Sequence, residues 1–144
     1  MSIKDFSLIE KFFSDGSLPE EKEQALYAEL VFMVLSRATA ADLNIEAVEV
    51  DAVIAKLKEL TGEDVTAQEI RVAALSKLYK FEPFERYVAK LSKNLTTEHR
   101  QSIVNALVEI FWSDGGAGPL EADFFNLVAG AIGLSPAELV NLRR

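Results

Sequence analysis

Apolar residues recur every three or four positions along almost the whole chain, which is the period of an α-helix. No segment shows the strict alternation of apolar and polar residues that marks a half-buried β-strand. Proline and glycine, which interrupt helices, occur only 4 and 7 times. The pattern therefore predicts an all-α fold with seven to eight helices. The expected helices cover residues 3–14, 17–40, 44–62, 66–78, 84–93, 97–112, 119–132 and 135–142.

Several helix ends carry their own signals. A serine or threonine followed three residues later by glutamate forms a capping box, which opens a helix. The boxes are Ser17–Glu20, Thr66–Glu69 and Ser135–Glu138. Gly62 and Gly133 suit the position just after a helix, where glycine adopts a left-handed backbone. Residues 97–112 have little polar face after Asn105, so we expect that helix to lie at the centre of the fold.

The size and charge of the chain limit the kinds of protein that it can be. With 144 residues and no linker-like stretch, we expect a single domain over residues 1–144. The formal net charge of −8 argues against nucleic-acid binding, because neutralising phosphates requires a basic surface. No apolar run is long enough for a membrane span, and the N-terminus lacks the apolar core of a signal peptide. We therefore expect a cytoplasmic protein.

The composition also excludes several kinds of chemistry. The chain has no cysteine, which excludes disulfides, thiolate metal sites and cysteine nucleophiles. Its one histidine, His99, rules out a multi-histidine metal site, and we expect it to be an exposed helix residue rather than a base. Phosphate-binding glycine loops and the G-x-S-x-G motif are absent. The sequence predicts neither an enzyme nor an organic cofactor.

Basic and aromatic residues are interleaved between Lys77 and Arg100. The aromatic residues there include Tyr79, Phe81, Phe84 and Tyr87. One interpretation is a nucleic-acid-binding strip. We favour the other, in which the aromatic rings are buried at helical spacing and the basic side chains form a solvated face.

The chain repeats itself with a constant offset of 72 residues. Asp42 corresponds to Asp114, and Glu49 corresponds to Glu121. Apolar positions in the flanking helices match at the same offset. The pairs are Val31 with Ile103, Leu35 with Leu107, Ala38 with Ile110, Val53 with Phe125, and Leu60 with Ile132. We therefore expect two related helical halves, roughly residues 25–72 and 97–144, each with an acidic corner between two helices.

These corners carry a resemblance to a known family. The segment Ala41–Ile45, followed by Glu49, resembles the A-D-G-x-[IL]-x-x-x-E corner of the tellurite-resistance TerB-like family. The N-terminal region of the co-chaperone DjlA is in the same family. The second corner, Ser113–Gly115 followed by Glu121, is similar to this motif as well. The resemblance extends from the second expected helix to the end of the chain.

The resemblance implies an all-helical domain of two related halves that acts as a non-enzymatic stress-response module associated with metals. It also implies four candidate metal ligands, which are Asp42, Glu49, Asp114 and Glu121. Carboxylate oxygens favour hard cations, so Ca²⁺, Mg²⁺ or Mn²⁺ would be preferred over Zn²⁺. The corners are not EF-hands, because Val53 and Phe125 stand where such a loop needs its twelfth-position glutamate.

The same carboxylates also suit a purely structural role, because helix ends attract acidic residues. The chain would then be a protein–protein interaction domain whose acidic first half docks a basic partner; residues 1–72 hold 15 acidic and 7 basic residues. A metal-dependent hydrolase is a third hypothesis that no motif supports. The expected partner is an unidentified protein or a second copy of the chain, and an exposed Phe124 would mark a dimer contact.

Overall fold

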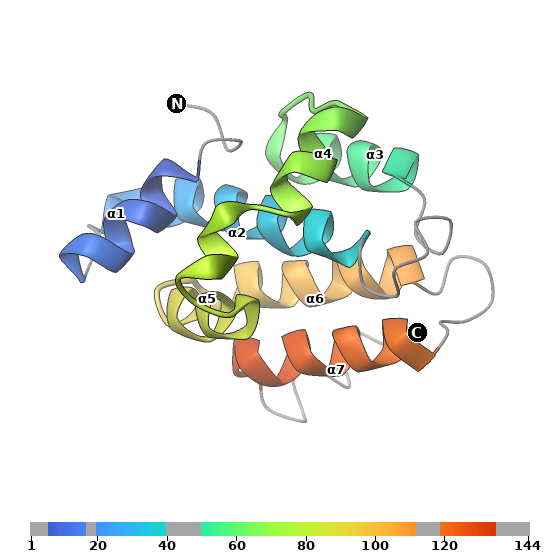
Figure 1. The fold of residues 1–144 in the computed structure, drawn as a ribbon. Helices are drawn as coiled ribbons and strands as arrows, with labels where there is room; N and C mark the ends of the chain where they lie inside the picture. The colour runs from blue at the N-terminus through green and yellow to red at the C-terminus, as the bar shows by residue number, and fades with distance from the viewer. Residues whose placement is uncertain (1–5, 17–19, 40–49, 112–118, 135–144) are drawn as a thin grey trace.

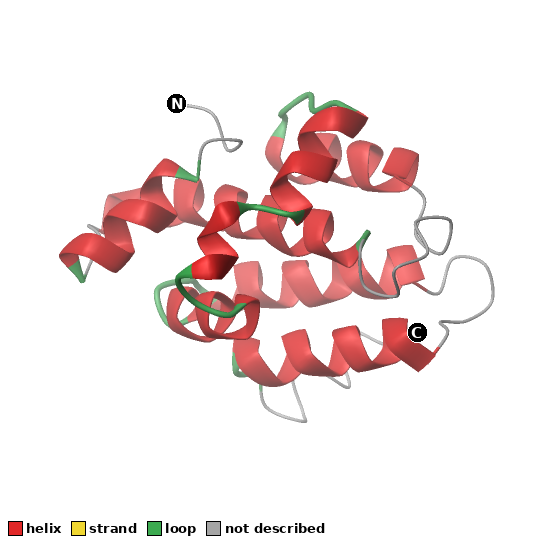
Figure 2. Ribbon diagram, in the orientation of Figure 1, coloured by secondary structure: helices red, strands yellow, loops and turns green. Residues whose placement is uncertain are grey.

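The computed structural model describes residues 6–16, 20–39, 50–111 and 119–134, and every regular element within these ranges is a helix (Figure 2). The α-helices are α1 (Ser7–Asp15), α2 (Glu23–Ala38), α3 (Val50–Thr61), α4 (Ala67–Ala74), α5 (Phe84–Ser92), α6 (Thr97–Phe111) and α7 (Pro119–Ile132). Two 3₁₀ helices join them, η2 (Glu20–Lys22) and η4 (Lys77–Lys80). The all-α prediction is confirmed. The further helix expected over residues 135–142 lies outside the described residues.

Helix α2 occupies the centre of the fold and packs against each of the six other α-helices (Figure 1). Its residues from Leu30 to Ser36 are all buried, because this apolar stretch leaves the helix without a polar face. The helix at residues 97–112 was expected to lie at the centre, but α2 holds the more central position. The corresponding helix, α6, lies beside α2 and exposes Glu109 on its outer side.

A carboxylate from α2 caps the N-terminus of helix α1. The residue before α1, Phe6, has a left-handed backbone with φ of 52° and gives the helix no side-chain cap. The buried carboxylate of Glu29 instead accepts hydrogen bonds from the backbone N–H groups of Leu8, at 3.0 Å, and Ile9, at 3.1 Å. The negative charge also suits the positive end of the helix dipole. Glu29 thus fixes α1 to the centre of the fold.

Local sequence signals set several of the other helix ends. At Thr66 the capping box is complete, because its Oγ1 accepts from Glu69 N at 3.1 Å while Glu69 Oε1 accepts from Thr66 N at 2.9 Å. Gly62 follows α3 with φ of 77°, and Gly133 follows α7 with φ of 79°. Both angles lie in the left-handed region that glycine adopts without strain. These predicted ends are confirmed.

The helix expected over residues 66–78 stops early, at Ala74. The guanidinium of Arg37 donates to the carbonyl of Ala74 at 2.6 Å and lies over the ring of Tyr79, 4.7 Å from its centroid. Ser76 Oγ then accepts from Leu78 N at 3.2 Å and opens η4. The helix ends here because of a contact with α2, which the local sequence does not encode.

The aromatic residues of the basic segment divide between core and surface. Phe84 and Tyr87 are buried and Tyr79 is half-buried, as the favoured interpretation predicts. Phe81 is exposed, so the interpretation was wrong at that position. The ring of Phe124 stacks on Phe84 with 5.4 Å between centroids and is half-buried. The prediction that an exposed Phe124 marks a dimer contact therefore loses its basis.

The apolar pairs of the sequence repeat can be compared where both members are described. Val31 and Ile103 are both fully buried, and so are Leu35 and Leu107. The acidic corners and the last helix of the second half lie outside the described residues, so the division into two halves stays a prediction. Among the helices of the described ranges, none combines the length and apolar composition that crossing a bilayer requires.

Candidate functional site

The four predicted metal ligands lie almost entirely beyond the described residues. Asp42, Glu49 and Asp114 belong to undescribed segments, and Glu121 belongs to the first turn of α7 without a described side chain. The flanking helices are described. The last turns of α2 and α6 and the first turns of α3 and α7 lie at one end of the molecule, on the right of Figure 1. We call this the corner end, since each helix pair there brackets one predicted acidic corner.

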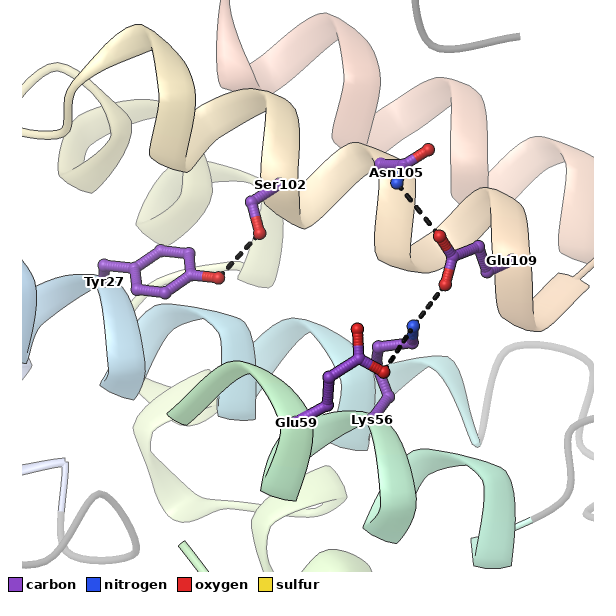
Figure 3. Close-up of polar contacts among 6 residues, drawn as sticks. All are labelled: Tyr27, Lys56, Glu59, Ser102, Asn105 and Glu109. Atoms are coloured by element: carbon purple, nitrogen blue, oxygen red, sulfur yellow. Dashed lines mark hydrogen bonds and ion pairs between the residues drawn. The ribbon is translucent and has the colours of Figure 1, made fainter. Parts of the chain in front are cut away.

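A polar seam joins α3 to α6 beside the corner end (Figure 3). The ammonium group of Lys56 in α3 lies 3.2 Å from Glu59 Oε1 and also forms an ion pair with Glu109 of α6. The amide of Asn105 donates to the second oxygen of Glu109 at 3.0 Å. Lys56 is only 14% exposed, so its charge depends on these partners. The seam thus connects α3, which follows the first predicted corner, to α6, which precedes the second.

The pKa of Lys56 reflects this pairing. Burial alone lowers the pKa of a lysine, because it disfavours the charged form. The hydrogen bonds and negative charges of Glu109 and Glu59 outweigh burial here and raise the pKa of Lys56 above its ordinary value. Both carboxylates are thus committed to the ammonium group. In the described ranges no three aspartate, glutamate or histidine side chains gather as metal ligands, and the seam itself is an ion-pair contact between α3 and α6.

A second polar cluster joins the first turn of α2 to the first turn of α6. The Oε2 atom of Glu23 lies 2.6 Å from His99 Nδ1 and accepts from Thr96 N at 2.9 Å. The His99 ring stacks on Tyr27, with 3.9 Å between centroids. His99 is therefore half-buried, and the prediction of an exposed helix residue was wrong. The sequence contains both Glu23 and His99, but no pattern in it indicates that these two residues, 76 positions apart, meet in the fold.

A hydrogen bond between two hydroxyl groups extends this cluster. The hydroxyl groups of Tyr27 and Ser102 share a hydrogen bond of 2.7 Å (Figure 3). Burial raises the pKa of Tyr27, the charge of Glu23 adds to that rise, and the bond to Ser102 opposes it. No hydrogen bond joins His99 to a serine in the described part of the chain. The contacts of the carboxylate and the histidine thus join the first turns of α2 and α6.

Comparison with protein families assigns this fold. The family model described as Tellurite resistance protein TerB matches residues 27–144. The chain belongs to the TerB family. We found no match among curated proteins and none among solved structures. Both predicted corners, 42–49 and 114–121, fall inside the TerB match, whereas α1, η2 and the first turn of α2 precede it. The hydrogen bonds of Glu29 thus connect a residue of the matched region to α1, which lies outside that region.

The polar seam of this TerB protein makes a testable contribution to stability. We expect Lys56→Met to lower the free energy of unfolding by about 1 kcal/mol, the upper range for a partly exposed ion pair. Because the pairing raises the pKa of Lys56, its stabilisation is complete below the unfolded lysine value of about 10.4 and disappears as pH rises through the folded value. Urea denaturation at pH 8 and in alkaline buffer should show the difference between the two proteins vanish at high pH.

Lys58 provides the matched control. It lies on the same helix and pairs with Asp64 at 3.2 Å, but both side chains are largely exposed. Lys58→Met should change stability by less than about 0.5 kcal/mol. If both variants lose the same amount at pH 8, then the seam has no special role in joining α3 to α6.

Proposed function

We propose that this TerB protein is a non-enzymatic stress-response module that binds a divalent cation through Asp42, Glu49, Asp114 and Glu121. One observation carries the proposal. The same aspartate-to-glutamate spacing recurs at an offset of 72 residues, and both copies fall within the residues that match the TerB family. A helix end needs an acidic residue only for capping, whereas a cation needs several carboxylates at fixed spacing.

The chemistry of the donors favours a hard cation. All four side chains are carboxylates, and the chain supplies no cysteine and only one histidine. His99 is already engaged with Glu23, at the ends of α2 and α6 far from the corners in sequence. We therefore propose Ca²⁺, Mg²⁺ or Mn²⁺ in preference to Zn²⁺. A protein without thiols cannot itself reduce tellurite through them, so a protective role would act through metal handling or assembly.

The arrangement of the helices supports a shared site. One carboxylate pair follows α2 and the other follows α6, and these helices finish at the same end of the molecule (Figure 1). The Lys56 seam holds α3 against α6 next to that end. We propose that the two acidic segments, which start from neighbouring helix ends, contribute to one ion or to two nearby ions. We place this function in the cytoplasm, which the cysteine-free composition suits.

The test is a titration of metal-stripped protein with Ca²⁺, Mg²⁺, Mn²⁺ and Zn²⁺. Fluorescence of the only tryptophan, Trp112, two residues before Asp114, reports binding, and the melting temperature reports stabilisation. At 100-fold excess over the Kd, binding adds about 2.7 kcal/mol, which corresponds to several degrees in a domain of this size. Glu121→Gln and Asp114→Asn should each abolish the response.

Asp123 serves as the control, because it is an exposed carboxylate in α7 two residues after Glu121. Asp123→Asn should bind the ion like the unmodified protein. A response kept by all three variants would indicate general attraction of cations to an acidic protein and not a site at the corners. A flat response to all four metals by folded protein would refute the cation site and support the alternative, an interaction domain with structural corners.

A further inference from the structure

Three apolar side chains in the segment from the last turn of α4 to the start of α5 are exposed. Val72, Leu75 and Phe81 are 61%, 76% and 75% exposed. We call these three residues the apolar strip. The only other large apolar side chain that is exposed within the described ranges is Leu127 in α7, at 38%. Three such residues within ten positions of the chain are more than the isolated apolar residues found on most protein surfaces.

The path of the chain places the strip on one side of the molecule. From the end of α4 through η4 to α5, the backbone crosses the front of α2 (Figure 2). Ala73, Ala74 and Leu78 face inward along this path and are buried. The exposed residues of the strip alternate with these buried ones and point away from the core. Val72 and Leu75 are neighbours on one helical turn, because Leu75 N donates to Val72 O at 3.3 Å.

The segment that carries the strip, residues 71–81, is basic, and the acidic residues that flank it, Glu69 and Glu82, are engaged with Thr66 and Arg86. Residues 71–81 contain three basic residues, Arg71, Lys77 and Lys80, and no acidic one, although the net charge of the chain is −8. Arg71 and Lys80 are exposed. Among the described residues neither forms an ion pair. The surface thus combines apolar anchors with unneutralised positive charge, which is complementary to a segment that carries apolar residues among acidic ones.

A second copy of the chain is a poor occupant of this surface. Self-pairing of the strip in a two-fold dimer would bring the basic residues of both copies together, which is unfavourable. The acidic half of another copy, residues 1–72, offers carboxylates. In its described part, however, that half exposes no large apolar side chain except Val72, which belongs to the strip itself.

An anionic bilayer is also disfavoured. Helix α3 packs against α4 and exposes Asp51 and Glu59, and the loop between these two helices exposes Asp64. A flat membrane covers much more of the protein surface than the strip, so the net charge of −8 opposes its approach, whereas a narrow peptide would contact the strip alone. We propose that the apolar strip, flanked by Arg71 and Lys80, docks an acidic amphipathic helix of another protein. This surface is separate from the corner end and does not depend on a bound cation.

Fluorescence anisotropy with a defined peptide tests the proposal. The probe is a labelled peptide of about 16 residues with leucine at helical i, i+3, i+4 and i+7 positions and glutamate elsewhere. Saturable binding is expected. The double variant Leu75→Ser/Phe81→Ser and the charge variant Arg71→Glu/Lys80→Glu should each weaken binding at least about tenfold. A peptide with lysine in place of glutamate should bind at least about tenfold more weakly than the probe.

Leu127→Ser is the matched control, because it removes an exposed leucine from α7 without touching the strip. It should leave the affinity unchanged, and all variants should keep the melting temperature and cation response of the unmodified protein. The proposal is overturned if the probe shows no saturable binding up to about 1 mM. It is also overturned if the strip variants bind the probe normally. Binding to phosphatidylglycerol vesicles that the same variants abolish would assign the strip to membranes instead, and dimer dissociation by Phe81→Ser would assign it to a second copy.

Discussion

Replacing Glu29 with alanine is expected to lower the free energy of unfolding by about 3 kcal/mol. The carboxylate is 3% exposed and accepts hydrogen bonds from Leu8 N and Ile9 N, the donors at the start of α1. Alanine removes the acceptor and leaves these buried N–H groups unsatisfied, and it leaves a cavity next to α2. Each unsatisfied donor costs about 1–3 kcal/mol. Urea denaturation measures the loss, and hydrogen exchange of the two amides shows whether α1 opens first.

Two further variants separate the role of Glu29 from general effects of substitution on this region. Glu29→Gln keeps the shape and one accepting oxygen but loses the charge at the helix N-terminus, so we expect about half of the alanine effect. Glu21→Ala removes an exposed carboxylate from η2 and should change stability by less than about 0.5 kcal/mol. Equal stability of Glu29→Ala and the unmodified protein would show that α1 is not held by this carboxylate.

Leu107→Ala is expected to destabilise the protein by about 3 kcal/mol. Leu107 lies on the inner face of α6 and is fully buried. Its partner in the sequence repeat, Leu35, is fully buried in α2. Truncating a buried leucine removes its transfer free energy and leaves a cavity that the surroundings fill only in part. If the two halves use these positions alike, then Leu35→Ala should cost a similar amount.

Thermal and urea unfolding measure both losses. The control is Leu127→Ala in α7, where the leucine is 38% exposed and the expected loss is below about 1 kcal/mol. A loss at Leu107 no larger than that at Leu127 would contradict the packing described for α6. A large loss at Leu107 together with a small loss at Leu35 would argue against equivalent roles for the two halves.

Local signals accounted for most of the secondary structure. The period of apolar residues predicts the helices, and the capping box at Thr66 and the glycines at Gly62 and Gly133 mark ends that depend only on nearby residues. The early end of α4 was not predictable in this way. It depends on Arg37, which comes from another helix to bind the Ala74 carbonyl. Where the local sequence allows a helix either to continue or to end, contacts between distant parts of the fold determine which of the two occurs.

The same distinction applies to individual side chains. Phe81 stands at a spacing that suits burial, yet the turn of η4 directs it outward. The contact between Glu23 and His99 spans 76 residues of sequence, and the contact between Lys56 and Glu109 spans 53. No periodicity indicates which carboxylate meets which cation over such separations. At the candidate site the sequence supplies the repeated acidic spacing and the family, while convergence of the corners stays a prediction.

Helix α1 has a consequence for where this domain can be divided. The TerB match begins at residue 27, inside α2, and this position is a natural domain boundary only if α1 is dispensable. The ring of Phe6 lies 5.5 Å from that of Phe32, and Phe13 lies 4.7 Å from Tyr87, so α1 covers side chains of the matched region. A fragment limited to that region would lack the Leu8 and Ile9 N–H groups that Glu29 binds and would expose the aromatic rings that α1 and Phe6 cover. We therefore expect the smallest fragment of this protein that folds stably to include α1, and so to be larger than the region that matches its family.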